Sequence, residues 1–315
     1  MKILIQDRFN DTERKFLEEG LIGHHLKFVQ KISQKDVDEA QIILGNPSSD
    51  LDIKKEHIKM IQLRSAGSDT FVNRIHPNTL LCNASGCYGV PLSEHVLALL
   101  LALSKNIPVY IHHMDQHLWK NLHQGKEVFQ SRVCIVGCGD LGTQTAKRLC
   151  SFDCHITGIK RRNTKQLKYF DEIKTIDELD DIIGDMDTVI LCLPHTKETN
   201  GLFNKERLLK MKKDAILINV GRGSAIIHDD LIEVLPYHLG GVGLDVTDPE
   251  PLPLEDPLWS NPKVLITPHS AGGFTWKSTR DKYIRLCLEN VRRMTENRPC
   301  LNQVDLDSGY RIDVK

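Results

Sequence analysis

Short apolar runs alternate with helix-like segments along most of the chain. In its middle, the runs fall at residues 133–137, 155–160, 187–194, 215–221, 241–246 and 263–269. Unbroken apolar strands that are separated by crossover-length segments are typical of a parallel sheet covered by helices on both faces. The pattern therefore predicts a doubly wound α/β domain in the middle of the chain.

Residues 2–84 repeat this alternation on a smaller scale. Their apolar runs fall at 2–7, 41–45, 60–67 and 79–84. Helix-like stretches separate these runs, which predicts a second, smaller α/β unit. A long apolar helix is predicted over 93–114, with Ser93 as its N-cap and Pro91 just ahead of it, and it would bridge the two units.

A further helix is predicted over 278–297, and the tail that follows it is too short to form a domain of its own. We expect this tail to return to the N-terminal unit, so that the middle domain is inserted into a discontinuous one. A chain of 315 residues is long enough for roughly two domains of about 150 residues each, in agreement with this organisation.

The composition is that of an ordinary globular protein, with 40% hydrophobic and 26% charged residues. No apolar run approaches the roughly 20 residues that span a bilayer, and no signal peptide is recognisable, so we expect a cytoplasmic protein without a membrane partner. A net charge of −1 gives no basic surface for nucleic acid. The nine cysteines are an odd, scattered set, unlike the paired framework of a small secreted domain.

A glycine-rich loop follows the first strand of the middle domain and precedes a helical segment. Its G-x-G-x-x-G pattern consists of Gly137, Gly139 and Gly142, with Asp140 and Leu141 inside it. The first glycine permits the tight turn, the second lets a pyrophosphate approach the backbone, and the third lets helix and strand pack closely. In this context the loop predicts a dinucleotide site; the alternative is a glycine-rich turn without a ligand.

The end of the next strand is basic where an acid is expected. Dinucleotide folds that bind NAD place an acid about 20 residues after the loop, on the ribose 2′-hydroxyl. Here that position carries Lys160, followed by Arg161 and Arg162. Cations would pair with a 2′-phosphate, so we predict NADP as the cofactor and NAD as the second choice. The alternative is a turn with solvated surface charges.

Three polar residues stand where later strands end, which is where ligands bind in open α/β sheets. Arg222 follows the run at 215–221, Glu250 follows 241–246, and His269 closes 263–269. Histidine can move a proton near neutral pH, a carboxylate can orient the ring, and arginine can bind a carboxylate or polarise a carbonyl. The trio fits reduction of a 2-keto acid or oxidation of a 2-hydroxy acid. Singly, each residue could equally be a solvated or hydrogen-bonded surface group.

With these residues in place, the chain resembles the D-isomer-specific 2-hydroxyacid dehydrogenase family. The resembling motifs occur in the family's order: SAGSD (65–69), SEHVLALLLALSKN, IVGCGDLG, LCLPHTKETNGLFN, NVGRG, LDVTDPEPLP, ITPHSAGG and NQVDLDSGY. The resemblance implies that His269 is the general acid/base, Glu250 its acidic partner, and Arg222 the contact for the substrate carboxylate and carbonyl.

The resemblance also implies ligand contacts outside the trio. Ala66 and Gly67 resemble the loop that holds the substrate carboxylate, and Asp245 resembles the contact for the nicotinamide carboxamide. The remaining implied cofactor contacts are Leu193, Pro194, His195, Thr199, Val220, Gly221 and Gly272. The family further implies a flavodoxin-like smaller domain, a cleft that closes on binding, and a homodimer formed through the cofactor domains.

We therefore expect a Rossmann-type doubly wound parallel sheet inserted into a smaller flavodoxin-like α/β domain. Residues 1–97 and 285–315 would form the substrate-binding domain, and residues 98–284 the dinucleotide-binding domain. Lys160 in place of the usual acid resembles the NADP-using hydroxypyruvate and glyoxylate reductases. This favours reduction of a small 2-keto acid to a D-2-hydroxy acid.

Two other functions stay open at this stage: a dinucleotide-sensing, corepressor-like interaction protein and an NAD-dependent phosphoglycerate-type dehydrogenase. The loop with Cys87 and Tyr88 does not reveal the substrate. His113 and His117 have a spacing that could hold a metal on a helix, but no H-E-x-x-H pattern accompanies them, and we predict no metal site.

Overall fold

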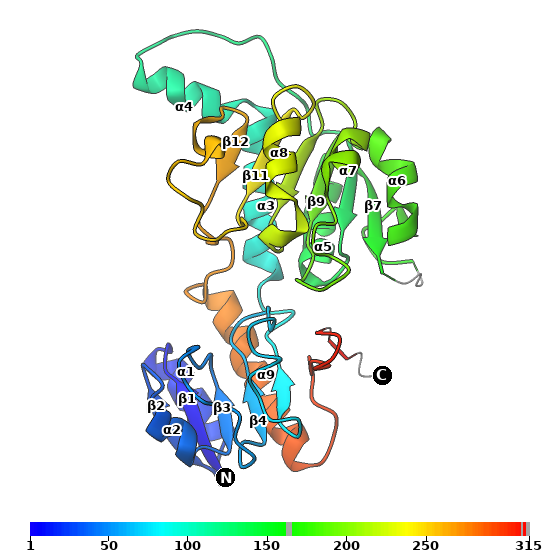
Figure 1. Ribbon diagram of the computed structural model, residues 1–315. Coiled ribbons are helices and arrows are strands. Elements are labelled where there is room, and N and C mark those ends of the chain that lie inside the picture. Colours follow the sequence, from blue (N-terminus) through cyan, green and yellow to red (C-terminus); the bar gives the residue numbers. More distant parts are fainter. Residues whose placement is uncertain (162–165, 310, 313–315) are drawn as a thin grey trace. The chain divides into compact units, whose positions relative to one another are not determined.

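The computed structural model describes residues 1–161, 166–309 and 311–312, and it divides the chain into two compact units. Unit 1 consists of Met1–Tyr88 and Gly273–Lys315, and unit 2 of Gly89–Gly272 (Figure 1). The boundaries predicted at 97/98 and 284/285 instead fall inside two helices. The compact units divide just ahead of these helices, so that each helix lies wholly in one unit. The functional assignment of the two domains stays a prediction.

Unit 1 contains a five-stranded parallel sheet in the order β2-β1-β3-β4-β5. Its strands are β1 (Lys2–Gln6), β2 (His25–Val29), β3 (Ile42–Leu44), β4 (Met60–Gln62) and β5 (Leu80–Cys82). Its helices are α1 (Asp11–Gly20), α2 (Gln34–Glu39) and α9 (Lys277–Thr295). This strand order is that of flavodoxin-like folds, so the prediction of a smaller flavodoxin-like domain is confirmed.

Unit 2 contains a seven-stranded parallel sheet in the order β12-β11-β10-β9-β6-β7-β8. Its strands are β6 (Arg132–Val136), β7 (His155–Lys160), β8 (Glu172–Thr175), β9 (Thr188–Leu191), β10 (Ile216–Asn219), β11 (Gly241–Leu244) and β12 (Val264–Ile266). The doubly wound sheet is confirmed. Strand β8 was not predicted, because this edge strand is polar and only partly buried and so lacks an apolar run.

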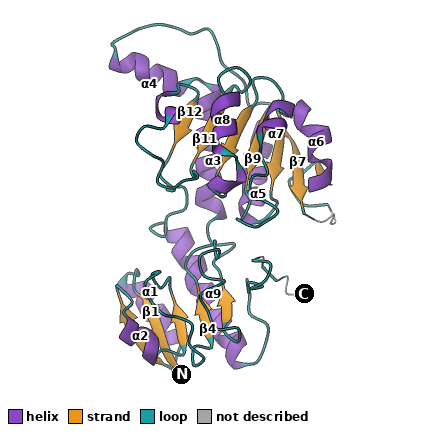
Figure 2. Ribbon diagram, viewed as in Figure 1, coloured by secondary structure: helices purple, strands orange, loops and turns teal. Residues whose placement is uncertain are grey.

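Helices connect and flank the strands of unit 2 (Figure 2). They are α3 (Gly89–Ser104), α4 (Ile107–Asp115), α5 (Asp140–Leu149), α6 (Leu179–Ile182), α7 (Lys205–Lys210) and α8 (His228–Val234). Short 3-10 helices cover Cys150–Phe152, Ile176–Glu178, Ile183–Asp185, Gly223–Ala225 and Pro257–Ser260. The fold is therefore of the Rossmann type, with the carboxyl ends of all seven strands at one edge of the sheet.

The single helix predicted over 93–114 is wrong in two respects. The helix begins at Gly89, so Ser93 lies inside α3 and donates its hydroxyl to the Val90 carbonyl rather than capping the helix. Pro91 also lies inside α3, in its first turn, where proline is tolerated because first-turn amides have no partner within the helix. Helix α3 ends at Ser104, and the chain turns at Asn106, which has a φ of 54°. Pro108 cannot continue α3 and lies instead in the first turn of α4.

Helices α3 and α4 meet at an angle of 67°. No single helix among the described residues is long and apolar enough to cross a membrane, and this bent pair passes such a test only by length and composition.

Helix α3 packs closely on strand β11 because that strand has two glycines facing it. A Cβ atom added at Gly243 would lie 3.2 Å from Leu99 Cβ, and one added at Gly241 would lie 3.3 Å from Leu103 Cδ2. The strand residues are two apart and the helix residues four apart, so each set lies on one face of its element. Continuing this register by one step pairs Asp245, just after β11, with His95 on α3.

Candidate active site

The glycine loop has the backbone that its sequence predicts. Gly137 follows β6 with a φ of 105°, a conformation that favours glycine. A Cβ atom at Gly142 would lie 2.1 Å from the Gly137 carbonyl oxygen, so only glycine allows this contact between loop and helix. At Gly139, by contrast, no heavy atom lies within 4 Å of an added Cβ. This open space fits the pyrophosphate of a dinucleotide.

Helix α5 begins directly after this open space. Its N-cap is Gly139, and no side-chain hydrogen bond caps the helix among the described residues, so its first amides can bind an anion. The carboxylate of Asp140 accepts a hydrogen bond of 2.8 Å from the amide of Gly89. Asp140 therefore also fastens the start of α3, whereas its predicted contact with a cofactor stays a prediction.

Lys160 ends β7, which pairs with β6, so its backbone stands one strand away from the glycine loop. Burial raises the pKa of the Cys138 thiol in that loop to about 12, and the charge of Lys160 opposes this rise. Lys160 is thus within electrostatic reach of the loop. The next residue, Arg161, is exposed, and Arg162 lies outside the described residues.

An acid lies within reach of Arg161. The pKa of Glu198 is lowered first by a backbone hydrogen bond of its own amide and by the Thr196 hydroxyl, and then by the charge of Arg161. Both Glu198 and Arg161 are exposed, so solvent screens this interaction.

The segments that leave β9 and β10 touch each other. A Cβ atom at Gly221 would lie 2.5 Å from the Leu193 carbonyl oxygen, so glycine is required for this approach. Farther along, His195 Nδ1 lies 2.7 Å from Ser224 Oγ. The buried hydroxyl of Thr199 donates to the Pro194 carbonyl, with an oxygen–oxygen distance of 2.6 Å. The Thr199 hydroxyl is therefore used within the turn.

Other predicted cofactor residues occupy the same edge of unit 2. Val220 is buried directly after β10, Leu141 is partly buried in the first turn of α5, and Gly272 is exposed at the end of the unit. Their contacts with a cofactor stay predictions.

The predicted catalytic residues follow three adjacent strands. Arg222 follows β10, Glu250 follows β11, and His269 follows β12. His269 Nδ1 lies 3.1 Å from each carboxylate oxygen of Glu250, and the two side chains are 48% and 44% exposed. The structure thus brings His269 and Glu250 into contact. It places Arg222 at the end of the strand next to β11, with Nη1 donating to the Gly221 carbonyl over 2.8 Å.

Asp245 holds the loop that carries His269. This carboxylate is 1% exposed, and its Oδ1 accepts the Thr267 hydroxyl at 2.7 Å and the amides of Ser270 and Ala271 at 2.9 and 3.1 Å. The main-chain oxygen of Asp245 also accepts the amide of His269 at 2.8 Å. His269 has a φ of 50°, which is uncommon for a residue other than glycine, and these hydrogen bonds hold it there.

Two residues of this network, His95 and Thr267, were not predicted from the sequence. His95 Nε2 lies 2.9 Å from Thr267 Oγ1 and 3.7 Å from Asp245 Oδ1. The only available signal was that His95, Leu99 and Leu103 share a helix face, and that face does not name its partner. A histidine on an apolar helix is therefore visible in sequence, while its contact with the loop of His269 is not.

The predicted carboxylate loop lies in unit 1. The Ser65 hydroxyl donates to the Gly67 carbonyl over 2.7 Å, while Ala66 is exposed. Just before this loop, the main-chain oxygen of Arg64 accepts the hydroxyl of the buried Tyr88 at 2.5 Å. The Tyr88 hydroxyl therefore supports the backbone beside the loop.

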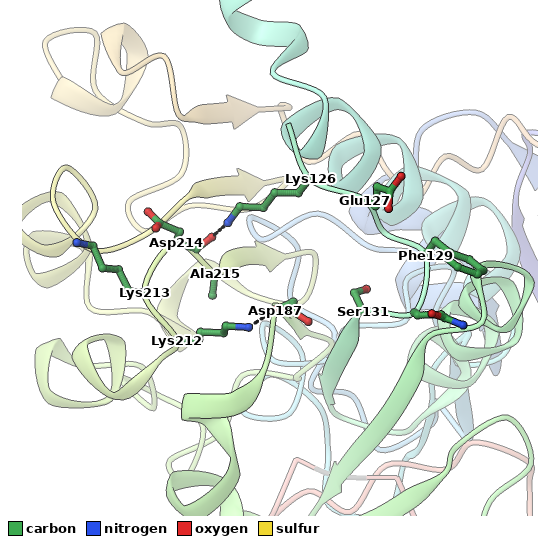
Figure 3. Close-up of a pocket in the computed structure, with 10 residues that line it drawn as sticks. Lys126, Glu127, Phe129, Ser131, Asp187, Lys212, Lys213, Asp214 and Ala215 are labelled. Atoms are coloured by element: carbon green, nitrogen blue, oxygen red, sulfur yellow. Dashed lines mark hydrogen bonds and ion pairs between the residues drawn. The ribbon is translucent and has the colours of Figure 1, made fainter. Parts of the chain in front are cut away.

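A cavity of about 490 Å³ lies away from these residues, at the amino ends of β6 and β10 (Figure 3). In it Lys212 pairs with Asp187 at 2.7 Å, and Lys126 donates to the Asp214 carbonyl (Figure 3). The cavity thus has several charged lining residues, of which Lys212 and Asp187 form an ion pair, and it lies at the edge opposite to His269.

Within the described ranges, no cluster of three or more histidine, cysteine or acidic side chains could hold a metal ion. His117 lies beyond the end of α4 and has a φ of 54°, so His113 and His117 do not share a helix face.

Comparisons with known proteins agree with this arrangement. A family model for the NAD-binding domain of D-isomer specific 2-hydroxyacid dehydrogenases matches residues 97–271. A glyoxylate/hydroxypyruvate reductase of Arabidopsis thaliana is 30% identical over 234 residues, which are 72% of this chain and 70% of the relative.

Two solved structures are similar over nearly the whole chain. A D-isomer specific 2-hydroxyacid dehydrogenase family protein of Aeromonas salmonicida has a TM-score of 0.85 at 28% identity, with 97% of this chain and 99% of that one covered. A D-isomer specific 2-hydroxyacid dehydrogenase of Xanthobacter autotrophicus, in complex with NADPH and MES, has a TM-score of 0.82 at 25% identity, with 98% and 99% covered. The chain therefore belongs to the D-isomer specific 2-hydroxyacid dehydrogenase family and is a nicotinamide dinucleotide-dependent oxidoreductase.

Proposed function

We propose that this enzyme uses NADPH to reduce a small 2-keto acid, of the glyoxylate or hydroxypyruvate kind, to a D-2-hydroxy acid. The observation that carries the proposal is the contact of His269 with Glu250 at the same sheet edge as the glycine loop. A proton-transfer group and a dinucleotide loop on one edge are the two parts that carbonyl reduction by hydride requires.

The proposed reaction adds a hydride to the keto carbon and a proton to the keto oxygen. A bound nicotinamide cofactor supplies the hydride. His269 gives the proton, and Glu250 holds its ring through Nδ1, which leaves Nε2 to face the substrate. Arg222 binds the substrate carboxylate and polarises the keto group. Ala66 and Gly67 of unit 1 are proposed as substrate-carboxylate contacts by family resemblance alone.

The proposed preference for NADPH rests on the charges at the end of β7. Lys160 and Arg161 supply cations where an acid would select NAD, and Arg162 is the third cation of this predicted set. The relative from Xanthobacter autotrophicus, solved with NADPH, supports this choice by similarity. NAD is the second choice.

A substrate panel tests the proposed function. The purified chain is mixed with glyoxylate, hydroxypyruvate or 3-phosphohydroxypyruvate and with NADPH or NADH, and the loss of reduced nicotinamide absorbance is followed. We expect the highest kcat/KM with NADPH and one of the two unphosphorylated acids. A preference for NADH with the phosphorylated acid would favour a phosphoglycerate-type enzyme. Cofactor binding without turnover of any keto acid would favour a dinucleotide-sensing protein.

We propose that α4 forms an interface with a second copy of this chain. None of the described residues of this helix is buried, and its exposed apolar side chains include Ile107, Ile111 and Met114. Leu118 and Trp119 extend the exposed apolar surface beyond the helix. A surface of this kind on one helix is typical of a subunit interface, and the family resemblance implies a homodimer through this domain.

A further inference from the structure

A second histidine lies behind the loop that carries His269. We propose that His95 is a positioning residue: through the Thr267 hydroxyl it fixes the Asp245 carboxylate, and through Asp245 it fixes the loop of His269. The kinetic part of this inference rests on the proposed function, whereas its structural part does not.

The register between α3 and β11 places His95 at this point. Gly241 faces Leu103, and Gly243 faces Leu99. Two residues further along the chain and four residues back along the helix, Asp245 lies beside His95. The two glycines allow the helix to lie close enough for this contact. His95 is thus held by the packing of a long buried helix, and its ring has a defined place beside the loop.

The hydrogen bonds that link His95, Thr267 and Asp245 run in one consistent direction. A carboxylate only accepts, so the Thr267 hydroxyl uses its single proton toward Asp245, over 2.7 Å. The same hydroxyl oxygen can then only accept from His95, at 2.9 Å. His95 Nε2 therefore carries a proton, and this N–H holds the Thr267 hydroxyl in the orientation that serves Asp245.

The loop of His269 depends on Asp245, at the other end of this series of hydrogen bonds. Asp245 accepts the amides of Ser270 and Ala271 through its carboxylate and the amide of His269 through its main-chain oxygen. Three consecutive amides are thus held by one residue. Loss of the His95 N–H frees the Thr267 hydroxyl to turn, removes a donor from Asp245, and loosens the turn in which His269 adopts its left-handed conformation.

Amide hydrogen exchange tests the structural part on the full chain, with or without activity. In His95→Leu and in Thr267→Val, we expect the amides of Ser270 and Ala271 to exchange about tenfold faster than in the wild type. His95→Gln keeps an N–H donor at nearly the same place, so its exchange rates should stay within about threefold. Unchanged exchange in both His95→Leu and Thr267→Val would overturn the proposal.

Steady-state kinetics test the functional part. We expect kcat of His95→Leu to fall about tenfold to a hundredfold while KM for NADPH changes less than threefold, because a misplaced acid slows chemistry whereas the glycine loop at residues 137–142 is left unchanged. His95→Gln should recover most of kcat. The matched control is His238→Leu, which removes another partly buried histidine of unit 2 that contacts the Met211 carbonyl at 2.8 Å, and its kcat should not change.

A double-mutant cycle separates this inference from the proposed function. If His95 acts through Thr267, the pair His95→Leu/Thr267→Val should have nearly the kcat of either single variant. Independent, multiplicative losses would overturn the route through Thr267. A wild type that turns over no keto acid refutes the proposed function, and the exchange rates at Ser270 and Ala271 still decide the structural inference.

Discussion

His269 Nδ1 lies 3.1 Å from both carboxylate oxygens of Glu250. Since a carboxylate only accepts hydrogen bonds, Nδ1 carries the proton and Nε2 is the ring atom that can exchange a proton with a substrate. A symmetric contact of this kind fixes both the tautomer and the plane of the ring. The two half-exposed side chains thus form one hydrogen-bonded unit, which we propose as the acid/base group of the reaction.

Removal of either member of this unit should therefore slow the chemical step. We expect His269→Ala to lower kcat by about 10²–10⁴-fold, with NADPH still bound, because a general acid is lost. Glu250→Gln should lower kcat by about tenfold or more, since the ring loses its charged partner. The exposed Glu255→Gln is the control. Steady-state rates and fluorescence titration with NADPH check both; near-normal turnover in His269→Ala contradicts the assignment.

Two glycine variants distinguish a ligand loop from a structural turn. Gly139→Ala adds a methyl group into open space, so we expect normal stability but NADPH binding weakened about tenfold or more. Gly142→Ala places its Cβ against the Gly137 carbonyl, so the fold itself should be destabilised. Thermal unfolding and cofactor titration measure the two effects. Undiminished NADPH affinity in Gly139→Ala would argue against a pyrophosphate at this position.

The end of β7 should control the choice of cofactor. Because hydrogen bonds to charged groups contribute about 1.5–3 kcal/mol, we expect Lys160→Ala or Arg161→Ala to lower kcat/KM for NADPH by about tenfold or more. The value for NADH should change little. Lys147→Ala, an exposed lysine on α5, is the control. Equal losses with both cofactors would show that these cations do not read the 2′-phosphate.

Unit 1 should lose stability in acid through Asp36. Burial alone would raise the pKa of this carboxyl, but hydrogen bonds from Lys27 and Ser33 lower it to about 2. A lowered pKa stabilises the folded state above the unfolded value of about 3.9, and this stabilisation is lost as the pH falls toward 2. We expect Asp36→Asn to cost about 2 kcal/mol at pH 7 and clearly less at pH 3.

Urea unfolding of the Asp36→Asn variant at the two pH values measures this difference. The exposed Asp38→Asn on the same helix is the control, and its effect should stay within about 0.5 kcal/mol. A cost that does not change with pH would assign the effect to packing rather than to charge.

The apolar surface of α4 should control the oligomeric state. A charge in a subunit interface is desolvated without a partner, so Ile111→Glu should convert a dimer to a monomer. Sedimentation velocity of the wild type and the variant measures this. The control is Leu254→Glu, an equally apolar and more exposed position away from α4. A monomeric wild type at all concentrations would contradict the homodimer.

Much of the fold follows from apolar runs, because strands buried on both faces must be apolar throughout. Strands β2 and β8 escaped this logic, since both are edge strands and an edge strand is free to be polar. The break between α3 and α4 was signalled by Pro108, yet the apolar pattern continued across it and suggested one helix.

The candidate site also contains residues that the sequence indicates and contacts that it does not. His269 and Glu250 stand at strand ends, where position alone indicates chemistry, and the structure brings them together. The hold of Asp245 on three successive amides depends on the path of a loop, which no spacing encodes. The contact of His95 with Thr267 joins residues far apart in the chain, and only the close packing of α3 on β11 creates it.

That close packing also has a consequence for redesign. A side chain at Gly243 must push α3 away from the sheet, and His95 would move with it. The packing of α3 on β11 thus sets the position of the loop that carries His269. Efforts to change the range of accepted acids should therefore leave the glycines of β11 untouched.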